Sequence, residues 1–166
     1  MFDLMIIDWY WWVAAAAAVV LISVPLIIRR RRRANGEVDF SAVARGQLEY
    51  IDQMDGVQFE HFIASMLQRL GYGSVDLTCG SHDQGVDVLA EREGVRFAIQ
   101  CKNYDSNLGN SAVQEVVAGR EYYRCHVGVV VTNSYFTRSA VELAAANRVL
   151  LWDRKDLAEM IDKLDL

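Results

Sequence analysis

Two neighbouring segments of the chain carry polar side chains of complementary chemistry at their ends. Asp87 stands at the head of the apolar segment Gly85–Ala90, and Gln100 and Lys102 close the next one, Val95–Lys102. Side chains alternate between the two faces of a strand, so Gln100 and Lys102 point the same way. A carboxylate, an amide oxygen and an ammonium that converge at a sheet edge suit a divalent cation, a phosphodiester and an attacking water. We therefore expect a metal-dependent, nuclease-like site there.

Four side chains have roles in this predicted site. Asp87 would be the central ligand of Mg²⁺, with Mn²⁺ as the alternative ion, and Gln100 would add its amide oxygen. Lys102 would lower the pKa of the attacking water or stabilise the charge of the pentavalent phosphorane. Glu60 lies one residue past Phe59, beside the apolar stripe of a predicted helix, and would reach the site from the side. The competing interpretation is a solvated strand end for Asp87 and Lys102, a solvated helix face for Glu60, and a structural hydrogen-bonding role for Gln100.

Three more polar residues are candidates for contact with a substrate or the metal ion. His82, Asp83 and Gln84 lie in the loop directly before Asp87. The competing interpretation is turn chemistry, because such polar side chains commonly bond to the backbone of turns.

Hydrophobic periodicity predicts the elements that must position these residues. Helices are predicted over residues 57–70, 111–123, 137–147 and 154–164, and strands over 74–78, 85–90, 95–102, 127–131 and 149–152. Ser111 and Asp153 are the predicted N-caps of two of these helices. The apolar run Val127–Val131 is interrupted only by Gly128, which is typical of a strand buried on both faces. This order predicts an α/β fold with a mixed central sheet flanked by helices.

The N-terminal part of the chain has the pattern of a membrane anchor. Residues 9–28 are uncharged and almost wholly apolar, and twenty helical residues span roughly 30 Å, the thickness of the hydrocarbon core of a bilayer. Five arginines, Arg29–Arg33, follow directly. Because short basic flanks stay in the cytoplasm, we expect a single-pass anchor in a bacterial inner membrane, with the N-terminus outside. A cleaved signal peptide is the alternative, but its positive charge precedes its apolar core.

The predicted organisation has three parts: an anchor with its polybasic flank (1–33), a linker or lead-in helix (34–55), and a cytoplasmic nuclease-like domain (56–166). Of the 17 basic and 22 acidic residues, five basic and two acidic ones precede residue 34, so the remainder has a formal net charge of about −8. This balance argues against a protein that grips DNA by broad electrostatic attraction alone. It does not exclude a nuclease, because a bound metal ion cancels local acidic charge.

Along residues 56–160 the chain carries, in this order, the segments Phe59-Glu60, Leu70-Gly71-Tyr72, Asp83-Gln84-Gly85-Val86-Asp87, Ile99-Gln100-Cys101-Lys102-Asn103, Val113-Gln114-Glu115, Val129–Ser134, Phe136-Thr137 and Leu151-Trp152-Asp153. In these segments and their order the chain resembles the Mrr-like restriction endonucleases of the PD-(D/E)XK nuclease superfamily.

The resemblance implies a restriction-endonuclease-like α/β core and Mg²⁺-dependent cleavage of DNA. It also implies that Asp87 is the metal-binding acid, that Gln100 and Lys102 form the QxK variant of the (D/E)XK pair, and that Glu60 matches the helix glutamate. Glutamine in place of the commoner acid should bind the metal ion more weakly. In the resemblance Gln114 faces the site and is a further candidate for contact with a substrate; the competing interpretation is a side chain that points to solvent.

Three functions follow from these observations. The first is a membrane-anchored, metal-dependent DNA endonuclease that acts in restriction or defence against foreign DNA. The second is a catalytically inactive scaffold of the same fold that binds DNA or a protein partner at the membrane. The third is a junction-resolving or RNA-cutting nuclease, which shares the site chemistry and would be expected to form a homodimer.

Overall fold

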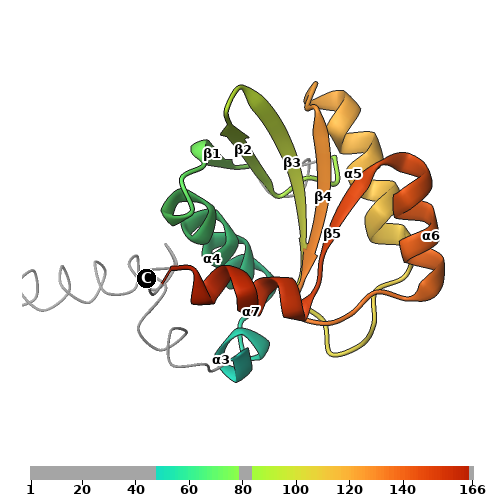
Figure 1. Ribbon diagram of the computed structural model, residues 1–166. Helices are drawn as coiled ribbons and strands as arrows, with labels where there is room; N and C mark the ends of the chain where they lie inside the picture. Colours follow the sequence, from blue (N-terminus) through green and yellow to red (C-terminus); the bar gives the residue numbers. More distant parts are fainter. Residues whose placement is uncertain (1–47, 79–83, 165–166) are drawn as a thin grey trace, which may run out of the picture. The chain divides into compact units, whose positions relative to one another are not determined.

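The computed structural model describes residues 48–78 and 84–164, and within them five strands form one mixed sheet (Figure 1). The strands, in their spatial order, are β1 (Gly73–Leu77), β2 (Val88–Arg92), β3 (Val95–Lys102), β4 (Val127–Thr132) and β5 (Val149–Trp152). The pairs β1–β2 and β2–β3 are antiparallel, whereas β3–β4 and β4–β5 are parallel. Strand β3 is therefore the element at which the sheet changes from one kind of pairing to the other.

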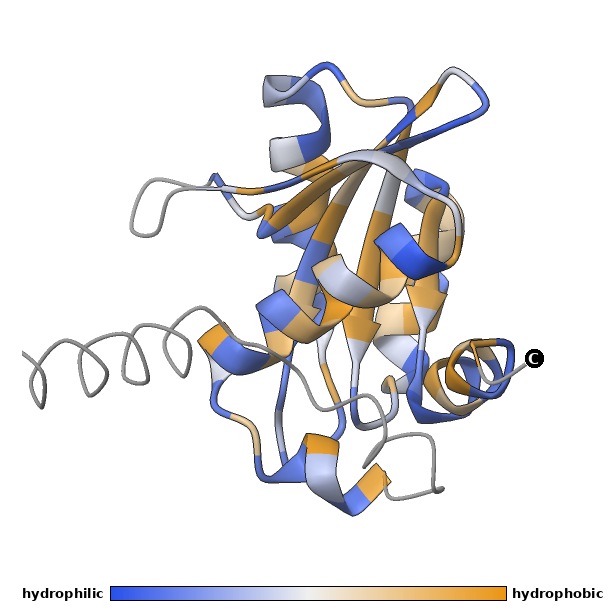
Figure 2. Ribbon diagram, turned by 90° about the vertical axis from the view of Figure 1, so that its left-hand side faces the viewer, coloured by the Kyte–Doolittle hydropathy of each residue, from blue (hydrophilic) through white to orange (hydrophobic). Residues whose placement is uncertain are grey.

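Helices cover both faces of the sheet (Figure 1). Helices α4 (Gly56–Arg69) and α7 (Arg154–Asp162) contribute to one hydrophobic core, and α5 (Asn110–Tyr122) and α6 (Arg138–Asn147) contribute to the other. A short helix, α3 (Leu48–Asp52), precedes α4. Hydrophobic residues run along the strands, while the helices carry hydrophilic residues as well (Figure 2). The predicted α/β fold with a mixed sheet flanked by helices is confirmed.

Strand β4 separates the two cores and explains why its sequence is apolar throughout. Val129 and Val131 belong to the core under α4 and α7, whereas Val130 belongs to the core under α5 and α6. All three side chains are fully buried. A strand covered by helices on both faces has no solvent-facing side, so the alternation of polar and apolar residues disappears.

Two local predictions were wrong. The strand predicted over 85–90 begins only at Val88, because Gln84 and Gly85 adopt positive φ angles of 51° and 77° and form a turn. Helix α5 begins at Asn110 with Gly109 as its N-cap, not at Ser111. Asp87 consequently lies one residue before β2, in a segment that turns into the sheet.

Close packing against α5 fixes the segment that leads to Asp87. A side chain at Gly119 would collide with Val86 and come within 2.6 Å of the carbonyl oxygen of Gln84. A side chain at Gly85 would come within 2.7 Å of the carbonyl oxygen of Glu115. The backbone of residues 84–86 and helix α5 thus approach each other at a distance that only glycine at both positions permits.

A polar network fastens α3 to the carboxyl ends of the parallel strands. Arg154 donates to both carboxylate oxygens of Asp52, at 2.6 and 2.8 Å, and Asn133 donates to the same carboxylate at 2.9 Å. The hydrogen bond from Arg154 holds the pKa of Asp52 below its ordinary value. Asn103, just after β3, donates to the carbonyl oxygens of Ile51 and Met54 at 3.1 and 2.6 Å.

Residues 1–47 and 79–83 lie outside the described part of the chain, and with them the predicted span over 9–28. Among the described residues no helix has the length and apolar character needed to cross a membrane. The anchor and its orientation stay predictions.

Substitution Gly119→Ala tests the packing of α5 against residues 84–86. We expect it to lower the free energy of unfolding by about 1–2 kcal/mol, because the collision outweighs the gain in helix propensity of roughly 1 kcal/mol. The matched control is Gly128→Ala, whose added carbon would lie 3.5 Å from Arg120 in ordinary contact. Urea denaturation of both variants measures the difference, and equal stabilities would contradict this packing.

Candidate functional site

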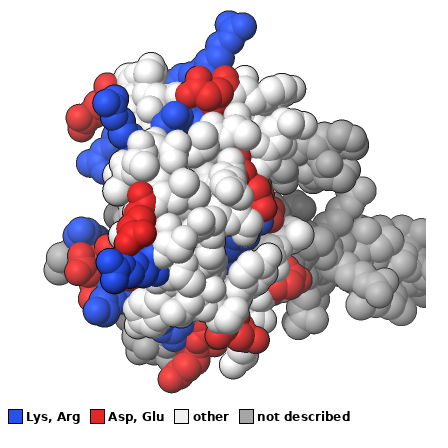
Figure 3. Space-filling model, turned by 90° about the vertical axis from the view of Figure 1, so that its right-hand side faces the viewer, with Lys and Arg blue, Asp and Glu red and all other residues white. Residues whose placement is uncertain are grey.

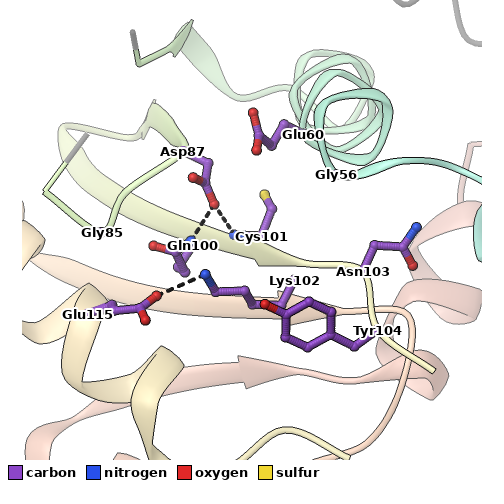
Figure 4. Close-up of a pocket in the computed structure, with 10 residues that line it drawn as sticks. All are labelled: Gly56, Glu60, Gly85, Asp87, Gln100, Cys101, Lys102, Asn103, Tyr104 and Glu115. Carbon is purple, nitrogen blue, oxygen red and sulfur yellow. Dashed lines mark hydrogen bonds and ion pairs between the residues drawn. The ribbon is translucent and has the colours of Figure 1, made fainter. Parts of the chain in front are cut away.

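A cavity of about 470 Å³ opens where β3 ends and the turn before β2 begins (Figure 4). Helices α4 and α5 supply its remaining walls. Its lining residues are Gly56, Glu60, Gly85, Asp87, Gln100, Cys101, Lys102, Asn103, Tyr104 and Glu115. The structure therefore brings together all four side chains that the sequence assigned to catalysis.

Asp87 is buried at the centre of this site, with only 6% of its surface exposed. Its Oδ2 accepts two hydrogen bonds of 2.6 Å, from the amide nitrogen of Gln100 and from the backbone N–H of Cys101. The backbone N–H of Asp87 donates to the carbonyl oxygen of Ile99 at 2.9 Å. A buried carboxylate needs such donors, since desolvation otherwise disfavours its charged form. Strand β3 thus holds Asp87 by hydrogen bonds to both the backbone and the carboxylate of Asp87.

Gln100 offers an oxygen whose hydrogen-bonding capacity is unused within the described residues. The side chain is 97% buried, and its Oε1 has no hydrogen-bond partner among them, whereas its Nε2 is bonded to Asp87. An unsatisfied buried carbonyl costs free energy, so it needs an explanation. A divalent cation that takes an oxygen ligand here provides one, and the predicted ligand pair Asp87 and Gln100 fits such an ion.

The ligand set differs from a preformed cage of ionisable side chains. Among the described residues no three His, Cys, Asp or Glu side chains come together as a group that could hold a metal ion. A site made of one carboxylate and one amide suits Mg²⁺, because this ion keeps several of its waters and needs few protein ligands.

Lys102 is held in the cavity by a residue that sequence analysis did not assign to the site. Its Nζ lies 2.9 Å from Oε2 of Glu115 on α5 (Figure 4). Burial lowers the pKa of Lys102, but the hydrogen bond and the charge of Glu115 outweigh this effect and raise it above its ordinary value. The side chain is therefore an ammonium. An ammonium suits both predicted roles, because its positive charge lowers the pKa of a nearby water and stabilises negative charge on a phosphate.

Glu60 reaches the cavity from the other face of the sheet. It belongs to α4, on the side of Cys101, whereas Gln100 and Lys102 face α5 (Figure 4). Burial raises the pKa of the Cys101 thiol well above its ordinary value, and the charges of Asp87 and Glu60 add to this effect. These effects favour the neutral thiol of Cys101 over the thiolate.

Of the candidate substrate-contacting residues, those that the structure describes do not line the cavity, unlike the four predicted catalytic residues. Gln84 and Gln114 are both exposed and do not line the cavity. His82 and Asp83 lie outside the described residues, so their assignment stays a prediction.

The helical arc of α5 explains why Glu115, and not Gln114, lines the cavity. Ala112 and Gly119 are buried against the sheet, and Glu115 lies three residues after the first and four before the second. Residues at these spacings share one side of a helix, whereas Gln114 is turned about 100° further round. The spacing of the apolar residues was the signal that could have identified Glu115 from the sequence.

Charges on the described part of the α5 and α6 side are mixed. Figure 3 shows Lys and Arg beside Asp and Glu around a wide uncharged centre, instead of one basic patch. On this face, as in the composition after residue 33, basic residues do not dominate.

Comparison with models of known protein families identifies the family of this chain. The Mrr_cat family model, described as a restriction endonuclease, matches residues 51–161, more than half of the chain. The chain belongs to this family. The predicted likeness to Mrr-type restriction endonucleases is confirmed.

Two known restriction enzymes are similar to this chain, one in sequence and one in fold. The type IV methyl-directed restriction enzyme EcoKMrr of Escherichia coli (strain K12) is 28% identical over 110 residues, which are 62% of this chain and 36% of that protein. The DNA modification-dependent restriction endonuclease AspBHI is 18% identical with a TM-score of 0.55, over 78% of this chain and 36% of that one. The second likeness supports the restriction-endonuclease-like fold. The chain spans about a third of the length of the curated relative that it matches.

A double-mutant cycle tests the ion pair between Lys102 and Glu115. Because Lys102 is mostly buried and Glu115 is partly exposed, we expect a coupling of about 1 kcal/mol between Lys102→Met and Glu115→Gln. The control cycle uses Arg138 and Glu142, a pair of equal length at 2.9 Å whose side chains are 93% and 63% exposed. Its coupling should stay within about 0.5 kcal/mol. Equal couplings in the two cycles, measured by urea denaturation, would contradict the buried role of the first pair.

Proposed function

We propose that the protein is a metal-dependent endonuclease that hydrolyses phosphodiester bonds of DNA. The observation that carries the proposal is the convergence of Asp87, Gln100 and Lys102 in one cavity, with the buried Oε1 of Gln100 lacking a partner among the described residues. The family of restriction endonucleases to which the chain belongs supports the same reaction.

Asp87 and Gln100 would hold a Mg²⁺ or Mn²⁺ ion. When bound, this ion supplies positive charge at the scissile phosphate and acidifies a bound water. Lys102, an ammonium under the influence of Glu115, stabilises the negative charge that grows on the phosphate oxygens. Glu115 positions Lys102, and Glu60 adds a carboxylate at the opposite wall. The hydrogen bonds from Gln100 and Cys101 keep Asp87 oriented toward the cavity.

Cleavage of DNA by the full chain, purified in mild detergent, tests this proposal. Supercoiled plasmid, methylated or unmethylated, is incubated with Mg²⁺, Mn²⁺ or EDTA. We expect metal-dependent nicking that falls at least about 100-fold in Asp87→Asn and Lys102→Met, because each removes a charge that acts in the transition state. Lys155→Met, at an exposed position of α7, is the matched control and should cleave like the wild type.

A direct measurement of ion binding separates the ligands from the rest of the machinery. Calorimetric titration with Mg²⁺ should show binding that Asp87→Asn abolishes and Lys102→Met retains. A well-folded protein that binds no divalent ion and cuts no DNA would instead support an inactive scaffold for DNA or a protein partner. The net charge of about −8 after residue 33 is the observation that favours this second candidate.

We also propose that residues 9–28 anchor the domain to a bacterial inner membrane, with the nuclease domain in the cytoplasm. The uncharged apolar run and the five arginines after it support this topology. There the enzyme would meet foreign DNA as it enters the cell, and a homodimer would place two sites on one duplex. The expected result is that the full chain sediments with membranes in carbonate buffer, and that replacing Arg29–Arg33 by serines disturbs its orientation. Release by carbonate alone would contradict the anchor.

A further inference from the structure

A second cavity, of about 370 Å³, adjoins the candidate active site. Tyr104 lines both cavities and therefore stands between them. The lining residues of the second cavity are Asp52, Tyr104, Asp105, Asn107, Asn133, Ser134, Tyr135 and Arg154. They come from α3, from the start of α7 and from the loops that follow β3 and β4, and the sequence analysis assigned no function to any of them.

Two exposed aromatic rings stand in the wall of this cavity. Tyr104 is 54% exposed and Tyr135 is 41% exposed. Their backbones are nevertheless fixed, since Tyr104 donates its N–H to Oδ1 of the buried Asn133 at 2.9 Å, and the carbonyl of Tyr135 accepts from Leu108 at 2.8 Å. The rings are therefore presented to solvent from well-bonded loops. Aromatic rings so presented, with their positions set in advance, are suited to stacking on a planar ligand.

The charges of the cavity argue against a phosphate as its occupant. Asp52 and Arg154 neutralise each other through two hydrogen bonds. Both ends of the Asn133 amide are also bonded, because its Nδ2 donates to Asp52 and its Oδ1 accepts from the N–H of Tyr104. Asp105 adds a carboxylate to the lining. An anion would meet no uncompensated positive charge among the described lining residues, whereas an uncharged, planar group with hydrogen-bonding edges fits beside the tyrosines.

We propose that this cavity binds an unstacked nucleobase of the substrate, one that neighbours the phosphate held in the active site. The inference rests on the proposed nuclease function, because Tyr104 places the base beside the phosphate site. A base enters such a site only when it is free of its own helix stack. The proposed substrate class is therefore DNA that is single-stranded or locally unpaired near the cut, in preference to a fully stacked duplex.

Binding of two single-stranded probes in EDTA tests the inference without cleavage. One probe is a fluorescent oligodeoxythymidylate, and the other is an abasic strand of equal length, which keeps the phosphates and lacks the bases. The full chain should bind the first at least about 5-fold more tightly, which is the lower range for stacking of one base on an aromatic ring. Tyr135→Leu should abolish this preference, and Tyr135→Phe should retain it, because stacking needs the ring and not the hydroxyl.

The matched control is Tyr122→Leu, since Tyr122 is 66% exposed on α5 and lines neither cavity. It should keep the wild-type preference. Equal binding of the two probes by the wild type, or an unchanged preference in Tyr135→Leu, would overturn the inference, even if Mg²⁺-dependent cleavage is observed. A base preference that depends on Tyr135 in a protein that cuts no DNA would support the base site and contradict the proposed nuclease.

Discussion

The site depends on the register of strand β3, which pairs with β2 on one side and β4 on the other. Gln100 lies opposite Val130, and Lys102 lies opposite Thr132. A slip by one residue would turn both side chains toward α4 and would place Cys101 on the side of α5. The hydrogen bond from the N–H of Asp87 to the carbonyl of Ile99 extends the same register beyond β2. The carboxylate, the amide and the ammonium are therefore aligned by backbone pairing before any ligand is present.

Helix α5 positions two further parts of the site. Its glycine, Gly119, lets the turn at residues 84–86 approach the helix axis, and one turn earlier Glu115 meets Lys102. The same face of one helix thus sets the path of the backbone into Asp87 and the position of the lysine.

The parts of the site that follow strict periodicity could be predicted from the sequence. Alternation along a strand placed Gln100 and Lys102 on one face, and the apolar stripe around Phe59 placed Glu60 beside the core. The start of β2 could not be predicted, because Gln84 takes a left-handed conformation that its residue type rarely adopts.

The second cavity could not be predicted from the sequence, because only the tertiary fold brings Asp52, Asn133 and Arg154 together. Each is an ordinary polar residue near the end of a helix or strand. Periodicity describes neighbours within one element and carries no information on which loops meet at the end of a sheet.

The attachment of α3 has a consequence for how the domain is joined to other parts of a protein. Asn103 binds the carbonyls of Ile51 and Met54 at the rim of the cavity, and Gly56, two residues later, lines it. Residues 48–56 are thus a structural part of the site and not a detachable lead-in to it. Exchanging a module that precedes Leu48 therefore requires that residues 48–56 be kept with the catalytic part.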